Sequence, residues 1–221
     1  MNIFDIIGPI MVGPSSSHTA GAVKIGQMVR ALLDAQPKQA EIWLHGSFAE
    51  TGKGHGTELA LVAGLLGMGP DDMRIPHSMK HAEEAGMEVV IDRMNIADAH
   101  PNTALIRVCD KDGDELEVQA CSIGGGRIQV NKIDGLRVNC SGEVPTLIIR
   151  NSDRPGMVAE VTAALARHNI NIAQMMLFRN KKGEDAVMVV ETDQKIPSQE
   201  IAAIHDQDGI LRVTYIGQED E

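Results

Sequence analysis

The sequence predicts an α+β protein with two domains. Alternating apolar and polar residues over 104–133 indicate an antiparallel hairpin followed by a third strand. After residue 145 a strand, a helix, two strands, a second helix and a last strand are expected in turn. This βαββαβ order is the ferredoxin-like plan.

The composition limits the class of protein. The 221 residues allow one large or two ordinary domains, and with only 2% aromatic residues we expect an aliphatic core in which methionine fills gaps. The net charge of −11 argues against nucleic acid as a partner. No apolar run approaches a membrane span, and the N-terminus lacks the basic region of a signal peptide. We therefore expect a cytoplasmic protein without a membrane partner.

The three cysteines, Cys109, Cys121 and Cys140, are odd in number and widely spaced. They fit neither a disulfide framework nor a C-x2-C metal site. We expect them to be small buried residues in a reducing cytosol. A role for one of them as a cluster ligand is the alternative, although nothing in their spacing requires it.

The elements of the first domain begin with an apolar segment, 3–10, that predicts a strand or a helix. Apolar residues at near 3.6-residue spacing predict a helix over 20–33. The next elements are a strand, a loop and a helix: 40–48, 51–57 and 57–66. Thr57 is the expected N-cap of that last helix. A further helix over 77–85 is expected to end at Gly86.

Strands complete the first domain and dominate the second. Those of the first domain are predicted at 88–91, 104–109, 115–122 and 128–133. Those of the second domain are predicted at 146–150, 169–178, 185–191 and 210–216. Its helices are predicted at 157–168 and 198–205. Because Ser141-Gly142-Glu143 has the composition of a short linker, we expect domains at 1–143 and 144–221.

The segment Gly13–Gly21 carries five polar side chains just before the first long helix. They are Ser15, Ser16, Ser17, His18 and Thr19. Free N–H groups and the positive end of the helix dipole make this place a seat for a carboxylate or phosphate. The alternative is that one hydroxyl simply caps the helix, which would leave four of the five side chains without a purpose.

Two further segments, 52–57 and 122–126, are rich in glycine, so their backbones could approach a small ligand closely. The first carries Lys53 for charge and His55 for proton transfer. It lacks the G-x-x-x-x-G-K-[ST] order of a phosphate-binding loop. The second has no G-x-G-x-x-G pattern and no helix after it, so a dinucleotide site is not expected there.

His18 and His55 are the candidate acid–base groups, because imidazole titrates near neutral pH. We expect the two segments that carry them to come together in space. Each could instead be an ordinary loop histidine bonded to backbone. His100 with Asn102 is a weaker third element, since this asparagine could simply shape a turn, and His45 is expected to be structural within a strand. No H-x3-H or H-E-x-x-H pattern supports a metal on these histidines.

The segment 151–156 is the notable turn of the second domain. Gly156 is expected to open a helix directly after a strand, so that its N–H faces a carboxylate. The alternative is an ordinary helix start with Pro155 as the first helical residue.

Four motifs follow one another along the first domain. They are Gly13-Pro14-Ser15-Ser16-Ser17-His18-Thr19, Thr51-Gly52-Lys53-Gly54-His55-Gly56-Thr57, His100-Pro101-Asn102-Thr103 and Ser122-Ile123-Gly124-Gly125-Gly126. Together they resemble the β subunit of the bacterial iron-sulfur L-serine dehydratases. The Asp153-Arg154-Pro155-Gly156 turn and the βαββαβ order resemble an ACT domain, which is common among regulators of amino-acid metabolism. The first domain also resembles the substrate-binding regulatory domain of some phosphoglycerate dehydrogenases.

The resemblance implies an L-serine ammonia-lyase that converts L-serine to pyruvate and ammonia. A [4Fe-4S] cluster would act as Lewis acid on the serine hydroxyl, held by cysteines of a separate α subunit or a fused α domain. This chain lacks such a cysteine set, so it would need the α subunit as its partner. ACT domains commonly pair edge to edge, which implies a homodimer.

The resemblance also implies roles for individual residues. The expected catalytic residues are His18 and His55. The expected substrate-binding residues are Ser15, Ser16, Ser17, Thr19, Lys53, Gly54, Asn102 and Ser122. Asp153 and Gly156 would bind an effector, and no residue of this chain would bind a metal. The competing hypotheses are a non-catalytic protein that senses L-serine and a module that serves only assembly.

Overall fold

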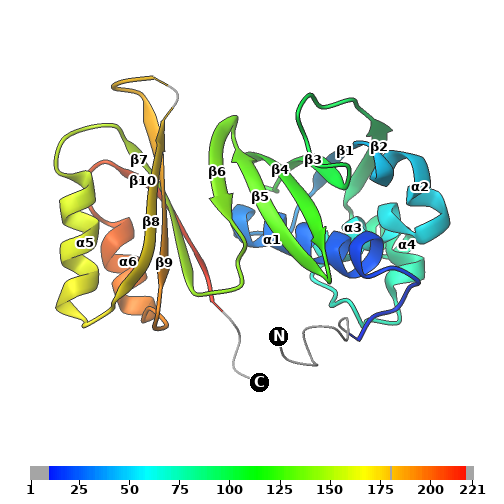
Figure 1. The fold of residues 1–221 in the computed structure, drawn as a ribbon, viewed down its shortest axis with the longest axis horizontal. Helices are drawn as coiled ribbons and strands as arrows, with labels where there is room; N and C mark the ends of the chain where they lie inside the picture. The colour runs from blue at the N-terminus through cyan, green and yellow to red at the C-terminus, as the bar shows by residue number, and fades with distance from the viewer. Residues whose placement is uncertain (1–9, 180, 218–221) are drawn as a thin grey trace. The chain divides into compact units, whose positions relative to one another are not determined.

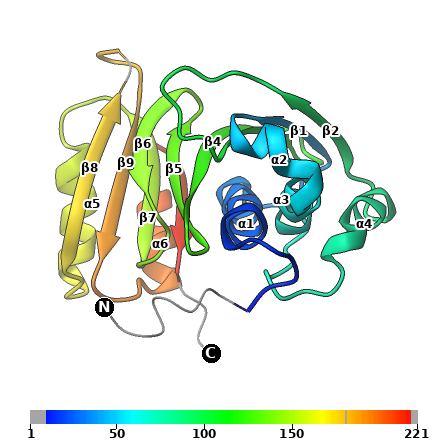
Figure 2. The ribbon, with the colours of Figure 1, turned by 45° about the vertical axis from the view of Figure 1, so that its right-hand side comes forward.

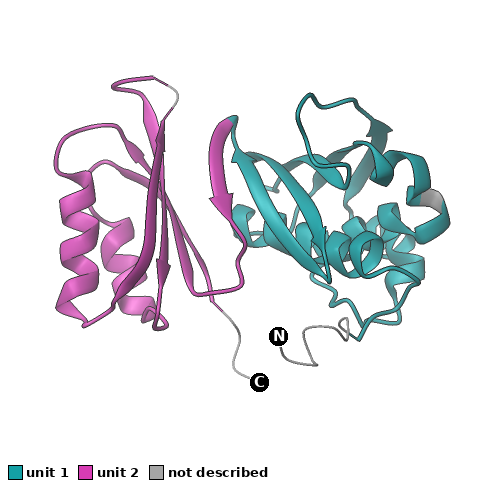
Figure 3. Cartoon of the chain, in the orientation of Figure 1, with its two compact units in different colours: residues 1–135 teal, residues 136–221 magenta. Residues whose placement is uncertain are grey.

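The computed structural model describes residues 10–179 and 181–217. These residues fall into two compact units that divide after Gly135 (Figure 3). The domain boundary predicted at residue 143 stays a prediction. Most of the apolar segment predicted over 3–10 lies outside the described residues.

The first unit is a sheet with helices against it (Figure 1). Its strands are β1 (Gln39–Leu44), β2 (Glu88–Arg93), β3 (Thr103–Cys109), β4 (Glu115–Gly124) and β5 (Arg127–Ile133). They lie in the order β2-β1-β3-β4-β5. The pairing of β1 with β2 is parallel, whereas β1–β3, β3–β4 and β4–β5 are antiparallel. The predicted hairpin over 104–122 is therefore confirmed.

The helices of this unit are α1 (Gly21–Leu33), α2 (Ser47–His55), α3 (Thr57–Leu65) and α4 (Ser78–Glu84). Helices α1 and α3 lie side by side (Figure 2). They approach closely because glycines face each other between them. A Cβ on Gly26 would lie 2.3 Å from the Leu61 carbonyl oxygen, and one on Gly64 would lie 2.0 Å from the Val23 carbonyl oxygen. Any side chain at either position would force the two helices apart.

The loop predicted over 51–57 is wrong, because Ser47–His55 forms α2. The strand predicted over 40–48 ends at Leu44, and His45 lies after it rather than within it. Two glycines inside α2 cost about 1 kcal/mol each in helix propensity. Burial of Phe48, which is 0% exposed, offsets that cost. Tertiary packing therefore overrides the local preference of this glycine-rich segment.

Two helices begin where they were predicted, at residues 57 and 157, but the cap expected for the first of them is wrong. Thr57 is the first residue of α3 rather than its cap, which is Gly56 in the left-handed conformation. In the second unit Gly156, at φ 100°, opens α5 as its cap, as expected, so the alternative with Pro155 as the first helical residue is wrong. Glycine replaces a side-chain cap in both places because the chain enters the helix through a positive φ.

The second unit contains β6 (Leu136–Cys140), β7 (Thr146–Ser152), α5 (Met157–Arg167), β8 (Ile172–Arg179), β9 (Asp185–Thr192), α6 (Ser198–His205) and β10 (Ile210–Ile216). Four of its strands form a sheet in the order β10-β7-β9-β8. Helices α5 and α6 pack on one face of that sheet (Figure 1). From β7 to β10 the element order is βαββαβ, as predicted. Strand β6 was not predicted.

Candidate functional site

A π-helical turn, Ser16–Ala20, precedes α1 and carries the serine-rich motif. Ser15 is its N-cap, and the Ser15 hydroxyl accepts a hydrogen bond of 3.2 Å from the His18 backbone N–H. Capping therefore accounts for one hydroxyl of the motif, as the alternative interpretation requires. Within the described residues the side chains of Ser16 and Ser17 form no hydrogen bond. Those two hydroxyls are left for another partner.

The structure brings His18 and His55 together. Their ring centroids lie 5.0 Å apart at an angle of 58°. His18 belongs to the π-helical turn and His55 to the last turn of α2. The Thr19 hydroxyl donates a hydrogen bond of 3.3 Å to the His55 carbonyl, which ties the two segments to each other.

Both ring nitrogens of His18 have hydroxyl neighbours. Its Nε2 lies 3.0 Å from the Ser47 Oγ, and its Nδ1 lies 3.4 Å from the Ser15 Oγ. The Phe48 ring packs against the imidazole edge-on at a centroid distance of 5.3 Å. These contacts fix the plane and the direction of the His18 ring.

The environment lowers the pKa of His18 below its ordinary value of 6.5. Burial is the largest cause, because a charged imidazolium is poorly solvated there, and the nearby His55 adds Coulomb repulsion. A hydrogen bond to the Ser47 backbone acts in the opposite direction and raises the pKa. His18 is therefore neutral near pH 7.

Three buried polar atoms around the π-helical turn have no hydrogen-bond partner among the described residues. They are the Nδ1 of His55, the Oγ1 of Thr57 and the Oγ of Ser122. The elements that carry them, α2, α3 and β4, each contact the turn. Buried polar groups are almost always paired in folded proteins, so three such atoms on elements that contact one turn indicate a site that a ligand or ordered water completes.

Ser122 and Asn102 are held together beside the start of α1. The Ser122 N–H donates to the Asn102 carbonyl at 3.0 Å, and the Asn102 side-chain amide donates to the Ser122 carbonyl at 3.4 Å. A Cβ on Gly21 would lie only 2.2 Å from the Ser122 Oγ. The hydroxyl of Ser122 thus occupies the space that glycine leaves at the first residue of α1.

Apart from Lys53, the other candidates from the sequence are either exposed or bonded to backbone groups. Gly54 is exposed, and a Cβ there would meet nothing within 4 Å. The backbone of Lys53 is helical, while its side chain is outside the described part of the structure. His100 accepts a hydrogen bond from the Asn102 N–H and shapes the turn before β3, and His45 accepts one from the Ile96 N–H. Both of these histidines are bonded to backbone.

Sequence reasoning missed Ser47 and Phe48, which contact His18 directly. The signal available was Gly46 before them, because glycine often marks the end of a strand and a sharp change of direction. The strand predicted over 40–48 concealed that signal.

The donor groups in the described part of this chain do not form a site for an iron–sulfur cluster. Among residues 10–179 and 181–217 no group of three or more His, Cys, Asp or Glu side chains could hold a metal ion. Cluster ligands are thiolates, yet burial raises the pKa of Cys121 and raises that of Cys140 to about 12. In the metal-free chain both thiols are therefore protonated near neutral pH. No helix in the described part is long and apolar enough to cross a membrane.

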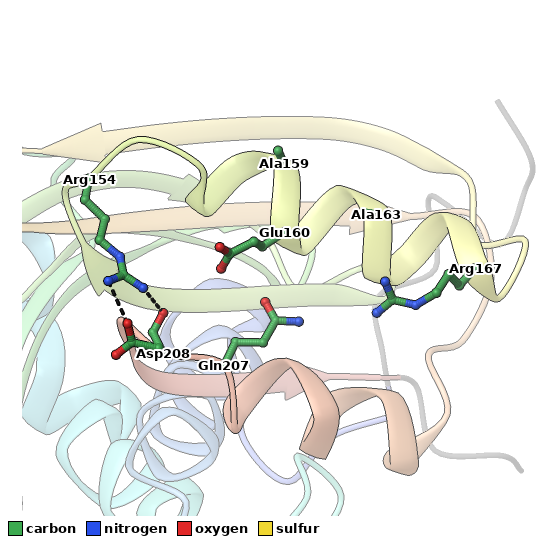
Figure 4. A pocket seen from close by; sticks show the side chains of 7 residues that line it. All are labelled: Arg154, Ala159, Glu160, Ala163, Arg167, Gln207 and Asp208. Atoms are coloured by element: carbon green, nitrogen blue, oxygen red, sulfur yellow. Dashed lines mark hydrogen bonds and ion pairs between the residues drawn. The ribbon is translucent and has the colours of Figure 1, made fainter.

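The second unit holds an open pocket of about 600 Å³ between α5 and the segment after α6 (Figure 4). Arg154 and Arg167 lie at its two ends, with Glu160 and Gln207 between them (Figure 4). Arg154 binds the Asp208 carboxylate at 2.7 Å. The pocket and the histidine pair belong to different units, so the catalytic assignment rests on side-chain contacts rather than on this cavity.

The predicted effector residues Asp153 and Gly156 are close in sequence to Arg154, which lines that pocket. The Asp153 carboxylate accepts hydrogen bonds from the Gly183 N–H at 2.8 Å and from Arg179 at 2.7 Å. These two bonds, the Gly183 bond first, lower the pKa of Asp153 although burial opposes them. Asp153 therefore fixes the turn between β8 and β9, and its contact with an effector stays a prediction.

Comparisons with known proteins agree with this architecture. Residues 2–88 match the family model "Serine dehydratase beta chain", and residues 146–209 match "ACT domain". The chain is 40% identical over 215 residues to "Probable L-serine dehydratase, beta chain" of Bacillus subtilis, covering 97% of both chains. It is 37% identical over 214 residues to "L-serine dehydratase, beta chain" of Peptoniphilus asaccharolyticus, covering 96% of both. An L-serine dehydratase of Helicobacter pylori is 26% identical over 81% of this chain and 44% of its own length. The chain therefore belongs to the family of L-serine dehydratase beta chains and carries a C-terminal ACT domain.

Proposed function

We propose that this chain forms the substrate-holding part of an enzyme that converts L-serine to pyruvate and ammonia. The observation that carries the proposal is the contact of His18 with His55, next to a turn whose neighbouring elements carry buried polar atoms without a partner among the described residues. These polar atoms match a small zwitterion, which brings both donors and acceptors. The alpha chain implied by membership among beta chains is proposed to carry a [4Fe-4S] cluster, and the two chains would meet in the cytoplasm.

The serine-rich turn is the proposed seat of the substrate carboxylate. Ser16 and Ser17 contribute hydroxyls without partners in the described structure, and Ser15 fixes the turn. The turn is also the first turn of a long helical segment, where N–H groups and the helix dipole favour an anion. Ser122, with Asn102 behind it, completes the seat from β4, and Thr19 keeps His55 in place. Lys53 and Gly54 are proposed to face the substrate from α2.

His55 is the proposed proton-transfer residue. Its Nδ1 is buried and has no partner among the described residues, so a substrate atom can take that position. Holding a base at hydrogen-bond distance from the proton it moves contributes about 10²–10⁴ in rate. His18, whose two nitrogens are occupied by hydroxyls, is proposed to support His55 rather than replace it.

The test is His55→Ala in the enzyme assembled with the alpha chain. Turnover of L-serine should fall by about 10²-fold or more, while far-ultraviolet circular dichroism of the chain stays unchanged. His100→Ala is the matched control, because His100 bonds to backbone in a turn, and it should keep turnover within about twofold. Near-normal turnover of the His55 variant would refute the proposed role.

A second function, regulation by a small ligand, is favoured by the pocket of the ACT unit. We propose an effector contact at the turn that carries Asp153 and Gly156, and a homodimer formed through an edge strand, β8 or β10, of the second sheet. Calorimetry of the full chain with L-serine distinguishes the hypotheses. Binding that survives His55→Ala and Ser16→Ala but is lost in Gly156→Val supports a regulatory site, and binding lost only in the first two supports the substrate site alone.

A further inference from the structure

Ser47 is placed by an unusual backbone turn. The preceding residue, Gly46, has φ 55° and ψ −125°, a conformation that residues with a side chain rarely adopt. A Cβ on Gly46 would also lie 2.7 Å from the Pro101 carbonyl oxygen. This glycine turns the chain sharply from β1 into α2, and the first residue of α2 then faces the π-helical turn. Strained turns of this kind are concentrated at functional sites.

The Ser47 hydroxyl does not serve the helix that it begins. A serine at a helix start usually caps free N–H groups, yet no side chain caps α2. Within the described residues the Ser47 Oγ has a single hydrogen-bond partner, the Nε2 of His18 at 3.0 Å. In the described structure this hydroxyl therefore does not cap the helix, and it bonds to the imidazole of His18 instead.

The contacts of His18 explain why that bond matters. Rotation about χ1 would carry the imidazole away from His55 and rotation about χ2 would turn its plane, and the Ser47 and Ser15 hydroxyls hold the ring from its two nitrogens. A hydroxyl can donate or accept, so it satisfies the ring in its neutral and its charged form. Of the two hydroxyls, Ser47 lies closer to its nitrogen, at 3.0 Å against 3.4 Å for Ser15.

We infer that Ser47 is a positioning residue for serine dehydration, which acts by holding the His18 ring beside His55 without touching the substrate. The inference rests on the role proposed above for the histidine pair. It assigns a part to a residue that lies outside the four motifs by which the chain resembles its family.

The test compares Ser47→Ala with Ser47→Thr in the enzyme assembled with the alpha chain. Loss of the hydrogen bond should lower kcat about tenfold and leave KM within about twofold, since Ser47 does not contact substrate. Ser47→Thr keeps the hydroxyl and should restore most of kcat. Thr51→Ala is the matched control on the same helix, because the exposed Thr51 hydroxyl bonds, within the described residues, to the Ser47 carbonyl alone. This control should keep the kcat of the unaltered enzyme.

A second measurement does not depend on turnover. Nitrogen-15 NMR of the full chain follows the titration of the His18 ring. The titratable group whose charge lowers the pKa of this ring is His55. A hydrogen bond from the charged imidazolium to Oγ is stronger than one from the neutral ring. Ser47→Ala should therefore move the His18 midpoint to lower pH, whereas Thr51→Ala should not.

The outcomes separate this inference from the proposed function. Unchanged kcat and an unchanged His18 midpoint in Ser47→Ala would overturn the inference, and so would a loss that Ser47→Thr does not recover. In a His18→Asn background, Ser47→Ala should cost nothing further, because its only route of action is gone; an additive loss would count against it. Full turnover of His18→Asn alone would instead refute the proposed role of the histidine pair.

Discussion

Ser122→Ala offers a test in which stability and activity move in opposite directions. Ser122 is 0% exposed, and its Oγ has no hydrogen-bond partner among the described residues. If this hydroxyl is kept for the substrate, the free chain carries it as an unpaired buried group. Removing it should then stabilise the chain and impair the enzyme. A hydroxyl with a structural purpose would give the opposite change in stability.

The magnitude follows from the two states of the hydroxyl. An unpaired buried hydroxyl costs about 1–3 kcal/mol, and alanine is somewhat less favourable than serine in a strand, so a net gain of about 1 kcal/mol is expected. For a unit of this size, that gain raises the midpoint of thermal unfolding by about 3 °C. In the assembled enzyme, loss of one hydrogen bond to substrate should lower kcat/KM about tenfold.

Ser78→Ala is the matched control. Ser78 is also 0% exposed, but its hydroxyl donates to the Leu59 carbonyl at 2.7 Å. Its loss should lower stability by about 1 kcal/mol, so the two serine variants should differ by about 2 kcal/mol. Trp43, the single tryptophan, lies in β1, and its fluorescence reports unfolding of the first unit. A lower midpoint for Ser122→Ala, parallel to that of Ser78→Ala, would show that the Ser122 hydroxyl is structural.

Two further predictions concern the same region. A Cβ on Gly21 would lie 2.2 Å from the Oγ and 2.8 Å from the Cβ of Ser122, so Gly21→Ala should destabilise the first unit by about 1–3 kcal/mol. Adding Ser122→Gly should recover most of that loss, and additive losses in the double variant would contradict the proposed clash. Burial, and then His55, lower the pKa of His18, so the unfolded chain binds this proton more readily than the folded one. The free energy of unfolding should therefore fall as the pH drops below 6.5. Urea unfolding of His18→Gln should show a weaker dependence of this free energy on pH, and an equal dependence in both proteins would contradict the prediction.

Elements that carry a regular apolar pattern could be predicted from the sequence. The helix predicted over 198–205 matches α6, and the strand predicted over 210–216 matches β10. The hairpin of β3 and β4 followed from strict alternation around a turn rich in aspartate and glycine. In these places local preference and tertiary packing favour the same structure.

The segment around α2 could not be predicted, because its local preference and its tertiary packing favour different structures. Gly52 and Gly54 favour a loop, and only the packing of Phe48 against the rest of the unit makes the segment helical. The error removed Ser47 from the list of candidates, because the residue was placed in a strand. The closeness of His18 and His55 was nevertheless expected, since both lie in segments whose polar residues had no other evident purpose.

The two histidines differ in what their nitrogens contact, and this difference divides their roles. A residue that moves a proton needs a nitrogen that is free to meet the substrate, and only His55 has a buried one without a partner in the described structure. His18 contributes by staying neutral. With ring centroids 5.0 Å apart, two imidazolium charges would repel by about 3 kcal/mol at an effective dielectric constant of about 20. A neutral His18 avoids that repulsion, and the Ser47 contact keeps the neutral ring beside His55.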